Sequence, residues 1–299
     1  MLFLAALITV FACGGAPRDE DSPGRFFTQA GKLQNVDIRE ASGLARSHRN
    51  DKILWAINDS GATPTLYALG ADGSDLGSVL LRDATNVDWE DLASFESGGK
   101  SWLLVADIGD NDSNRDHVTL YFVEEPVLPQ VDLAPAWQLS FAYPDGPRDA
   151  EAIAVDLEHQ QILILSKRTI PAVLYAVPLR PHTGELTIAR RLGEISSIPQ
   201  PTPADLDRAI PDNDWHWQPT GMDISQDGRS AVILSYRAIY TFKRDAGESW
   251  IEAMQSTPLR RGLGEIRAAE AVAFDLSGQA IFVTVEQQHA PLIRFDAQR

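Results

Sequence analysis

Glu151-Ala152-Ile153-Ala154 is a short apolar segment headed by a carboxylate, and four similar segments recur along the chain. The five segments are Ser42-Gly43-Leu44-Ala45, Glu90-Asp91-Leu92-Ala93, Glu151-Ala152-Ile153-Ala154, Thr220-Gly221-Met222-Asp223 and Glu270-Ala271-Val272-Ala273. Recurrence of this kind is the signature of a repeat architecture. Each segment is therefore expected to open one structural unit.

Each opening segment is followed by a more hydrophobic strand and then by a third strand. The second strands are Ile53–Ile57, Trp102–Ala106, Ile162–Leu165, Ala231–Leu234 and Ala280–Val285. The third strands contain Leu66-Tyr67, Leu120-Tyr121, Leu174-Tyr175, Ile239-Tyr240 and Leu292-Ile293. Fourth strands are expected at Gly77–Leu81, Ala136–Ala142, Leu186–Leu192 and Trp250–Ser256. Enrichment in β-branched and aromatic residues, with turn residues between the runs, predicts a four-stranded meander in each unit.

The fifth unit shows three strands, whereas a strand-like segment at Phe26–Val36 precedes the first unit. Pairing of that segment with the fifth unit closes the ring and removes two exposed sheet edges. We therefore predict an all-β fold, a five-bladed β-propeller closed by an N-terminal strand, as a single domain over residues 26–299. The alternatives are a β-sandwich and a six-bladed propeller with a degenerate blade at Pro199–Trp217, a proline-rich stretch that we interpret as a long loop.

The N-terminal segment predicts export. Leu2–Ala12 is an apolar run of signal-peptide length, and Val10-Phe11-Ala12-Cys13 resembles the lipobox of bacterial lipoproteins. The resemblance implies that Cys13 is lipidated, that residues 1–13 are a signal peptide and that residues 14–25 are a flexible tether. We expect a protein of the bacterial cell envelope, lipid-anchored and either periplasmic or surface-exposed. A plain cleaved signal peptide is the alternative.

The charge of the chain argues against a nucleic-acid partner. It contains 26 Lys and Arg against 42 Asp and Glu, a formal net charge of −16. Such a chain repels a polyanionic backbone unless its basic residues gather in one patch, and no such patch is visible. An acidic surface is compatible with binding of hard cations such as calcium. We expect a monomer with a small anionic molecule or an envelope component as its partner.

The heads of the five segments predict a metal site. The first strand of each propeller blade lines the central channel, so these positions form a ring: Ser42, Glu90, Glu151, Thr220 and Glu270. Three carboxylates in a narrow channel repel one another unless they are protonated or neutralised by a cation. Calcium accepts mixed carboxylate, hydroxyl and water oxygens, whereas zinc and copper favour the His and Cys ligands that this ring lacks. The alternative is that the glutamates bond to backbone amides at the strand starts.

This ring resembles that of the calcium-activated nucleotidases, or soluble apyrases, which are five-bladed propellers. In that family a Ser, Glu, Glu, Ser, Glu set holds the central calcium, and the present order differs only by Thr220 in place of the second serine. The resemblance covers the blade pattern and the ring. It implies a propeller fold and a calcium site, and it says less about the substrate. A looser likeness links the Glu-Ala-Ile phrases to exported propellers with esterase-like activity of phytase.

Polar residues follow the second strands, at the end that faces the ring. They are Asn58, Asp59, Asp107, Asp110, Asn111, Lys167, Arg168, Tyr236, Arg237 and Glu286, and Arg148 and Asp149 lie just before a ring position. Four cations are candidates for binding an anionic substrate: Arg148, Lys167, Arg168 and Arg237. A channel mouth with calcium at its centre could orient a phosphate ester and activate water beside the ion.

Three functional hypotheses follow from these patterns. The first is a calcium-dependent hydrolase of phosphate esters or anhydrides. The second is a cell-envelope binding module in which the calcium is structural, because many propellers only bind and fold does not fix function. The third is a glycosidase-like propeller in which two glutamates act as acid and as nucleophile or base.

Overall fold

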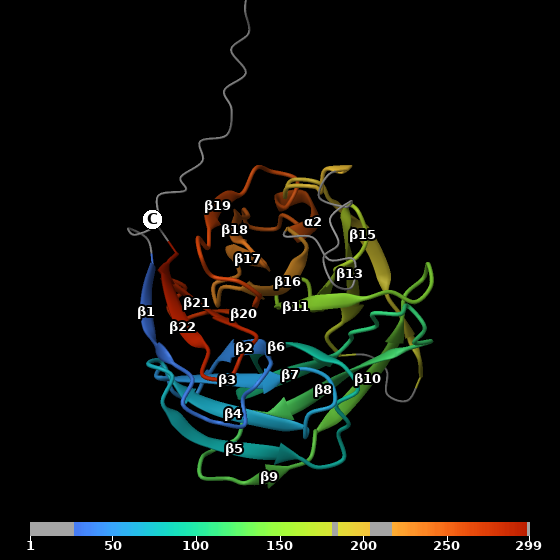
Figure 1. Cartoon of the computed structure of the whole chain (residues 1–299). Helices are drawn as coiled ribbons and strands as arrows, with labels where there is room; N and C mark the ends of the chain where they lie inside the picture. Colours follow the sequence, from blue (N-terminus) through green and yellow to red (C-terminus); the bar gives the residue numbers. More distant parts are fainter. Residues whose placement is uncertain (1–26, 181–184, 204–216, 298–299) are drawn as a thin grey trace, which may run out of the picture.

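Five sheets surround a common centre in the computed structural model, which describes residues 27–180, 185–203 and 217–297 (Figure 1). Their innermost strands are β2 (Ala41–Arg46), β6 (Trp89–Ser97), β11 (Ala150–Asp156), β16 (Pro219–Ile224) and β20 (Ala269–Phe274). Each inner strand contains one of the five repeated segments and opens one blade, numbered 1 to 5 in that order. The prediction of a five-bladed β-propeller is confirmed.

The middle strands of each blade follow their inner strand in antiparallel order. The second strands are β3 (Ile53–Asn58), β7 (Lys100–Asp107), β12 (Gln161–Ser166), β17 (Ser230–Ser235) and β21 (Ala280–Val285). The third strands are β4 (Thr65–Gly70), β8 (Val118–Glu124), β13 (Ala172–Pro178), β18 (Ala238–Lys243) and β22 (Pro291–Asp296). Both sets lie where the hydrophobic runs predict them.

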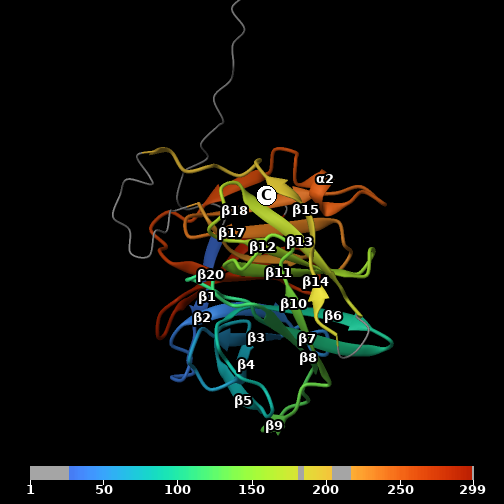
Figure 2. The same ribbon diagram turned by 90° about the vertical axis from the view of Figure 1, so that its right-hand side faces the viewer.

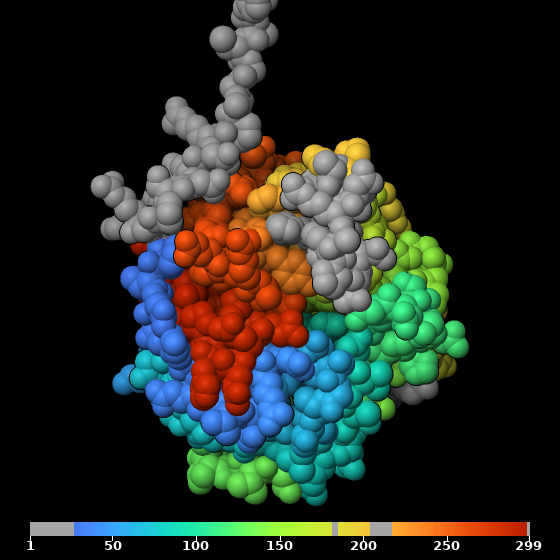
Figure 3. Space-filling view, viewed as in Figure 1, coloured from blue at the N-terminus to red at the C-terminus, as the bar shows by residue number. Residues whose placement is uncertain are grey.

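The outer strands close the ring as expected. They are β5 (Asp75–Leu81), β10 (Trp137–Ala142), β15 (Arg190–Ile195), β19 (Leu259–Gly262) and, for blade 5, β1 (Phe27–Lys32). β1 pairs antiparallel with β22, so Phe27 lies opposite Phe295 and their rings are 5.3 Å apart. Figure 3 shows the blue N-terminal strand lying against the red C-terminal strands. An N-terminal strand thus completes the last blade.

The prediction of a strand at Trp250–Ser256 is wrong, because this segment begins with the helix α2 (Trp250–Ala253). Ser249 caps the helix by accepting a hydrogen bond from the backbone N–H of Glu252, whose side chain bonds back to the Ser249 N–H. This capping box stabilises a helical turn more strongly than the local aromatic content favours a strand. The outer strand of blade 4 is instead β19, which lies beyond the helix and pairs with β18.

Two short strands link consecutive blades. β9 (Asp132–Leu133) leaves blade 2 and pairs in parallel with β5 of blade 1. β14 (Thr187–Ile188) likewise pairs in parallel with β10 of blade 2, as Figure 2 shows. The expected strand at Leu186–Leu192 is therefore divided between β14 and the start of β15. These additions cover outer sheet edges that would otherwise be open to pairing with other chains.

The hydrophobic core lies between neighbouring sheets. Four clusters of buried apolar side chains join adjacent blades around the ring. Trp55 and Trp89 are almost fully buried between blades 1 and 2. In the described part of the chain no helix is long and apolar enough to cross a membrane. The predicted signal peptide, Cys13 and the tether lie outside the described residues, as does most of Pro199–Trp217.

Candidate metal centre

All five ring residues occupy the same structural position, a β-bulge at the start of the inner strand. The pairing of each inner strand with its second strand shifts register around one residue. These five residues are Ser42, Glu90, Glu151, Thr220 and Glu270. A bulge leaves its extra residue out of the ladder and re-aims its side chain. The fivefold repetition therefore sets one polar residue per blade, outside the strand ladder, at one end of the central channel.

The two hydroxyls of the ring also link blades. Ser42 Oγ donates a hydrogen bond to the carbonyl of Trp89 at 2.8 Å, and Thr220 Oγ1 donates to the carbonyl of Ala269 at 2.7 Å. In both cases the acceptor precedes the ring carboxylate of the next blade. A hydroxyl oxygen that donates its proton keeps its lone pairs, so these contacts are compatible with binding an ion.

The three ring carboxylates lie in an environment that disfavours their charge. Glu90 and Glu151 are 6% and 5% exposed, and Glu270 is half-buried. Burial, followed by repulsion from Glu151, raises the pKa of Glu90 and that of Glu270 well above the usual range. An added cation would offset both effects, because it favours the ionised carboxylates.

One buried ammonium already lies among these acids. Lys167, directly after β12, forms an ion pair with Glu151 Oε1, and both side chains are 6% exposed. Its charge also lowers the pKa of Glu90 and of Glu270, although burial and the neighbouring acids outweigh it. Lys167 therefore compensates part of the negative charge of the ring and leaves an excess of carboxylates.

A second tier of acids surrounds the ring. Glu40, Asp88 and Asp149 each precede a ring residue by two positions in the chain. Asp59 follows β3 and Glu286 follows β21, as the sequence predicts for the channel mouth. Burial, followed by repulsion from Asp59, raises the pKa of Asp88 to about 6.

These acids form two triads that share one residue. Asp59, Asp88 and Glu90 have carboxylate oxygens within 4.8 Å of one another, and so do Glu90, Asp149 and Glu151. The sequence analysis missed Asp88, although an acid two residues before the ring position recurs in blades 1 to 3. Two or three carboxylates at this spacing, with hydroxyls nearby, are a donor set suited to a hard cation.

Gly109 makes room for the shared carboxylate. A Cβ at this position would lie 2.2 Å from Glu90 Oε1 and 2.4 Å from Asp88 Oδ2. Any larger residue must therefore push these two side chains away. The glycine permits the close approach of backbone and carboxylates that the first triad requires.

The four cations that were predicted to bind an anion have different surroundings in the structure. Lys167 lies in the ring, and Arg168 Nε donates to Asp149 Oδ2 at 2.8 Å, at the edge of the second triad. Arg148 pairs instead with Asp145 and stacks over the rings of Tyr143 and Tyr175. Arg237 is half-buried in the turn between β17 and β18.

Buried polar bonds lie across the channel next to the ring. Asp91 accepts hydrogen bonds from the backbone N–H of Ile153 at 2.8 Å and of Met222 at 3.4 Å, in blades 3 and 4. Asp223 accepts from Arg46 of blade 1 at 2.8 Å and from the backbone N–H of Phe274 in blade 5. These bonds tie all five blades together and lie between the acidic mouth and the other face of the disc.

Comparisons with known proteins leave the family open. No protein-family model and no curated protein sequence matches the chain. Among solved structures, it is similar to a gluconolactonase of Xanthomonas campestris, with 11% identity, 91% of this chain and 85% of that chain covered, and a TM-score of 0.47. A luciferin-regenerating enzyme gives 10% identity, 90% and 93% coverage and a TM-score of 0.45. Hydrazine synthase of Kuenenia stuttgartiensis gives 8% identity, 85% and 83% coverage and a TM-score of 0.45. Likenesses of this size assign no function.

Proposed function

We propose that this protein binds calcium at the acidic mouth of its channel and uses the site to hydrolyse phosphate esters or anhydrides. The proposal rests on one observation, the two carboxylate triads that meet at Glu90 with a single buried ammonium among them. The donors are oxygens only, which favours calcium over zinc or copper. The resemblance of the ring to that of calcium-activated nucleotidases points to the same ion.

The residues of the chain have distinct roles in this proposal. The two triads would hold the ion, which supplies positive charge for an anionic substrate and polarises a bound water. Lys167 and Arg168 lie beside Glu151 and Asp149, so they would face an anion that approaches the mouth. A calcium ion that takes over these two carboxylates frees both cations to orient a phosphate group.

A second candidate is a binding module of the cell envelope in which the calcium is structural. It is favoured by the pairing of Lys167 and Arg168 with carboxylates and by the attachment of Arg148 to two tyrosines. Under this alternative the cations stabilise the ring and take no part in substrate binding.

A hydrolysis assay separates the two candidates. Nucleotides and phosphomonoesters are incubated with the wild type, Glu151→Gln and Gly109→Ala, with calcium or with a chelator. The hydrolase proposal expects calcium-dependent release of phosphate that both variants lose. Gly109→Ala is the sharper variant, because its closest contacts are with the carboxyl groups of Glu90 and Asp88 and it removes no charge. Calcium binding without turnover would favour the binding module, and absence of calcium binding would contradict both.

We also propose that the protein is exported and anchored to the membrane through a lipid on Cys13. The support is the apolar run of residues 2–12 and the lipobox-like sequence that ends at Cys13. In cells grown with labelled palmitate, the label should be incorporated into the wild-type protein and not into Cys13→Ala. The variant should also move from the membrane fraction to the soluble fraction. Equal labelling of the two proteins would contradict the anchor.

A further inference from the structure

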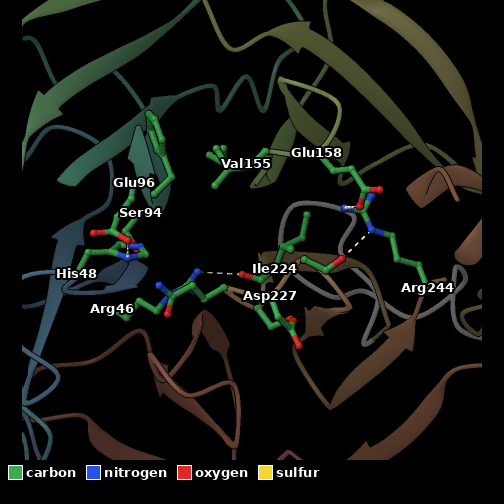
Figure 4. A pocket seen from close by; sticks show the side chains of 14 residues that line it. Arg46, His48, Ser94, Glu96, Val155, Glu158, Ile224, Asp227 and Arg244 are labelled. Carbon is green, nitrogen blue, oxygen red and sulfur yellow. Dashed lines mark hydrogen bonds and ion pairs between the residues drawn. The ribbon is translucent and has the colours of Figure 1, made fainter. Parts of the chain in front are cut away.

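A second hollow lies at the opposite end of the inner strands. The ring residues stand at the starts of these strands, whereas this cavity of about 320 Å³ is bordered by the ends of β2, β6, β11 and β16. Arg46, His48, Ser94 and Glu96 lie on one side, and Glu158 and Arg244 on the other, as Figure 4 shows. A cavity of this size is within the range of small-molecule sites.

The floor of the cavity contains buried polar atoms without partners among the described residues. The His48 side chain is 3% exposed, and neither ring nitrogen makes a hydrogen bond of good geometry, although the backbone of Ser94 interacts with the ring. Its Nδ1 lies 3.9 Å from Glu96 Oε2, which is too long for one. Ser94 Oγ and Arg46 Nε also lack partners. Nearly all buried polar groups in native proteins have a partner in the protein or in ordered water, so three such groups on one hollow indicate a place where water or the hydroxyls of a ligand bind.

The charges around the cavity exclude a strongly charged occupant. Arg46 is engaged with Asp223, and Arg244 with Asp156 and Glu158, so neither is left to bind an anion. The carboxylates of Glu96 and Asp227 add negative charge to the rim. The rim carboxylates would repel an anion, and at the floor the charge of Arg46 disfavours a second positive charge beside His48.

The unpartnered groups include both donors and acceptors. Arg46 Nε–H and the Ser94 hydroxyl can donate. Burial, followed by the charge of Arg46, lowers the pKa of His48 to about 4, so the ring is neutral at pH 7 and offers one N–H and one acceptor nitrogen. Hydroxyl groups both donate and accept, so they match such a mixed set. Val155 and Ile224 supply apolar surface for the C–H groups of a ligand.

We propose that this cavity binds a neutral polyhydroxylated molecule of monosaccharide size. Its hydroxyls would bond to His48, Ser94 and Arg46 Nε at the floor and to Glu96 at the rim. The site is separated from the acidic mouth by the buried bonds of Asp91 and Asp223, so it does not depend on calcium.

Ligand-observed NMR with D-glucose, D-galactose and myo-inositol, in the presence of a chelator, tests this site on the whole protein. Glucuronate and glucosamine serve as matched charged probes. At least one neutral probe should bind at millimolar concentration and shift the imidazole nitrogen signals of His48. His48→Phe and Ser94→Ala should weaken binding about tenfold or more, because each removes groups that the ligand bonds.

Two variants keep the test independent of folding and of the metal centre. His48→Phe removes two unpartnered nitrogens and is expected to fold at least as well as the wild type. Glu270→Gln alters the acidic mouth and should leave sugar binding unchanged. Failure of all neutral probes, preference for the charged probes, or unchanged binding in both His48→Phe and Ser94→Ala would overturn the proposal. Loss of calcium binding alone would leave it intact.

Discussion

Removal of the buried ammonium at the channel mouth should strongly destabilise the calcium-free protein. Lys167→Met removes the ammonium that pairs with the buried Glu151 carboxylate, and breaking a buried ion pair from one side costs about 3–5 kcal/mol. Glu90 and Glu270 lose the same compensating charge, because Lys167 lowers the pKa of both. The loss of stability should therefore reach at least the lower end of that range.

Urea unfolding followed by circular dichroism measures this effect. With a chelator present, Lys167→Met should unfold at a midpoint lower by about 1 M or more. Calcium should restore much of the loss, since it supplies positive charge to the same carboxylates. The double variant Lys167→Met/Glu151→Gln should be more stable than Lys167→Met alone, because the buried carboxylate charge is also removed.

Lys100→Met is the matched control. Lys100 pairs with Glu124 at the surface, where both side chains are about half exposed. Breaking such a pair changes the free energy of unfolding by about 1 kcal/mol or less. Two results would contradict a shortage of positive charge at the mouth. In the first, Lys167→Met is as stable as Lys100→Met in the chelator. In the second, calcium does not restore the stability that Lys167→Met has lost.

Three further predictions concern other parts of the channel. Asp91→Ala leaves two buried backbone N–H groups of blades 3 and 4 without acceptors, so urea unfolding should show a loss of about 2–6 kcal/mol; a loss under about 1 kcal/mol would contradict the role of these bonds. Burial and Arg46 lower the pKa of His48 from 6.5 to about 4, with Glu96 as the facing carboxylate, so above pH 6.5 the ring is neutral in both states and costs no stability by titration. As the pH falls from 6.5 towards 4, stability should fall by up to about 3 kcal/mol, and His48→Phe should flatten this dependence in pH-dependent melting curves. In the chelator, Glu270→Gln should increase the free energy of unfolding by about 1 kcal/mol and so raise the melting temperature, whereas the stabilisation by calcium should decrease. A lower melting temperature in the chelator would count against repulsion at this position.

The blades could be predicted from the sequence because their hydrophobic second and third strands recur in the same order after each repeated opening segment. The segment from Trp250 was misassigned because its apolar and aromatic content suits a strand, whereas the capping box of Ser249 and Glu252 decides for a helix. β9 was missed, and β14 was not separated from β15, because segments of two residues carry no periodic signal. Their pairing depends on the neighbouring blade, which local sequence does not encode.

The sequence predicts the ring and three of the surrounding acids, Asp59, Asp149 and Glu286, but not Glu40 or Asp88. The ring positions were found because they head the repeated segments. The bulges that re-aim them are backbone features and leave no pattern in side-chain type. Asp88 was overlooked because it precedes the repeated segment, although the spacing of Asp149 from Glu151 is the same. The contact of Gly109 with Glu90 joins two distant strand ends and depends on the tertiary fold.

A calcium titration by isothermal calorimetry is the decisive experiment on the metal centre. Glu90 belongs to both carboxylate triads, so Glu90→Gln is the decisive variant, and Glu96→Gln, an exposed change at the other end of the same strand, is its control. The account predicts that the wild type and Glu96→Gln bind calcium with similar affinity, whereas Glu90→Gln binds it at least about tenfold more weakly. Absence of calcium binding by the wild type, or equal binding by all three proteins, would contradict a metal centre at the mouth of the channel.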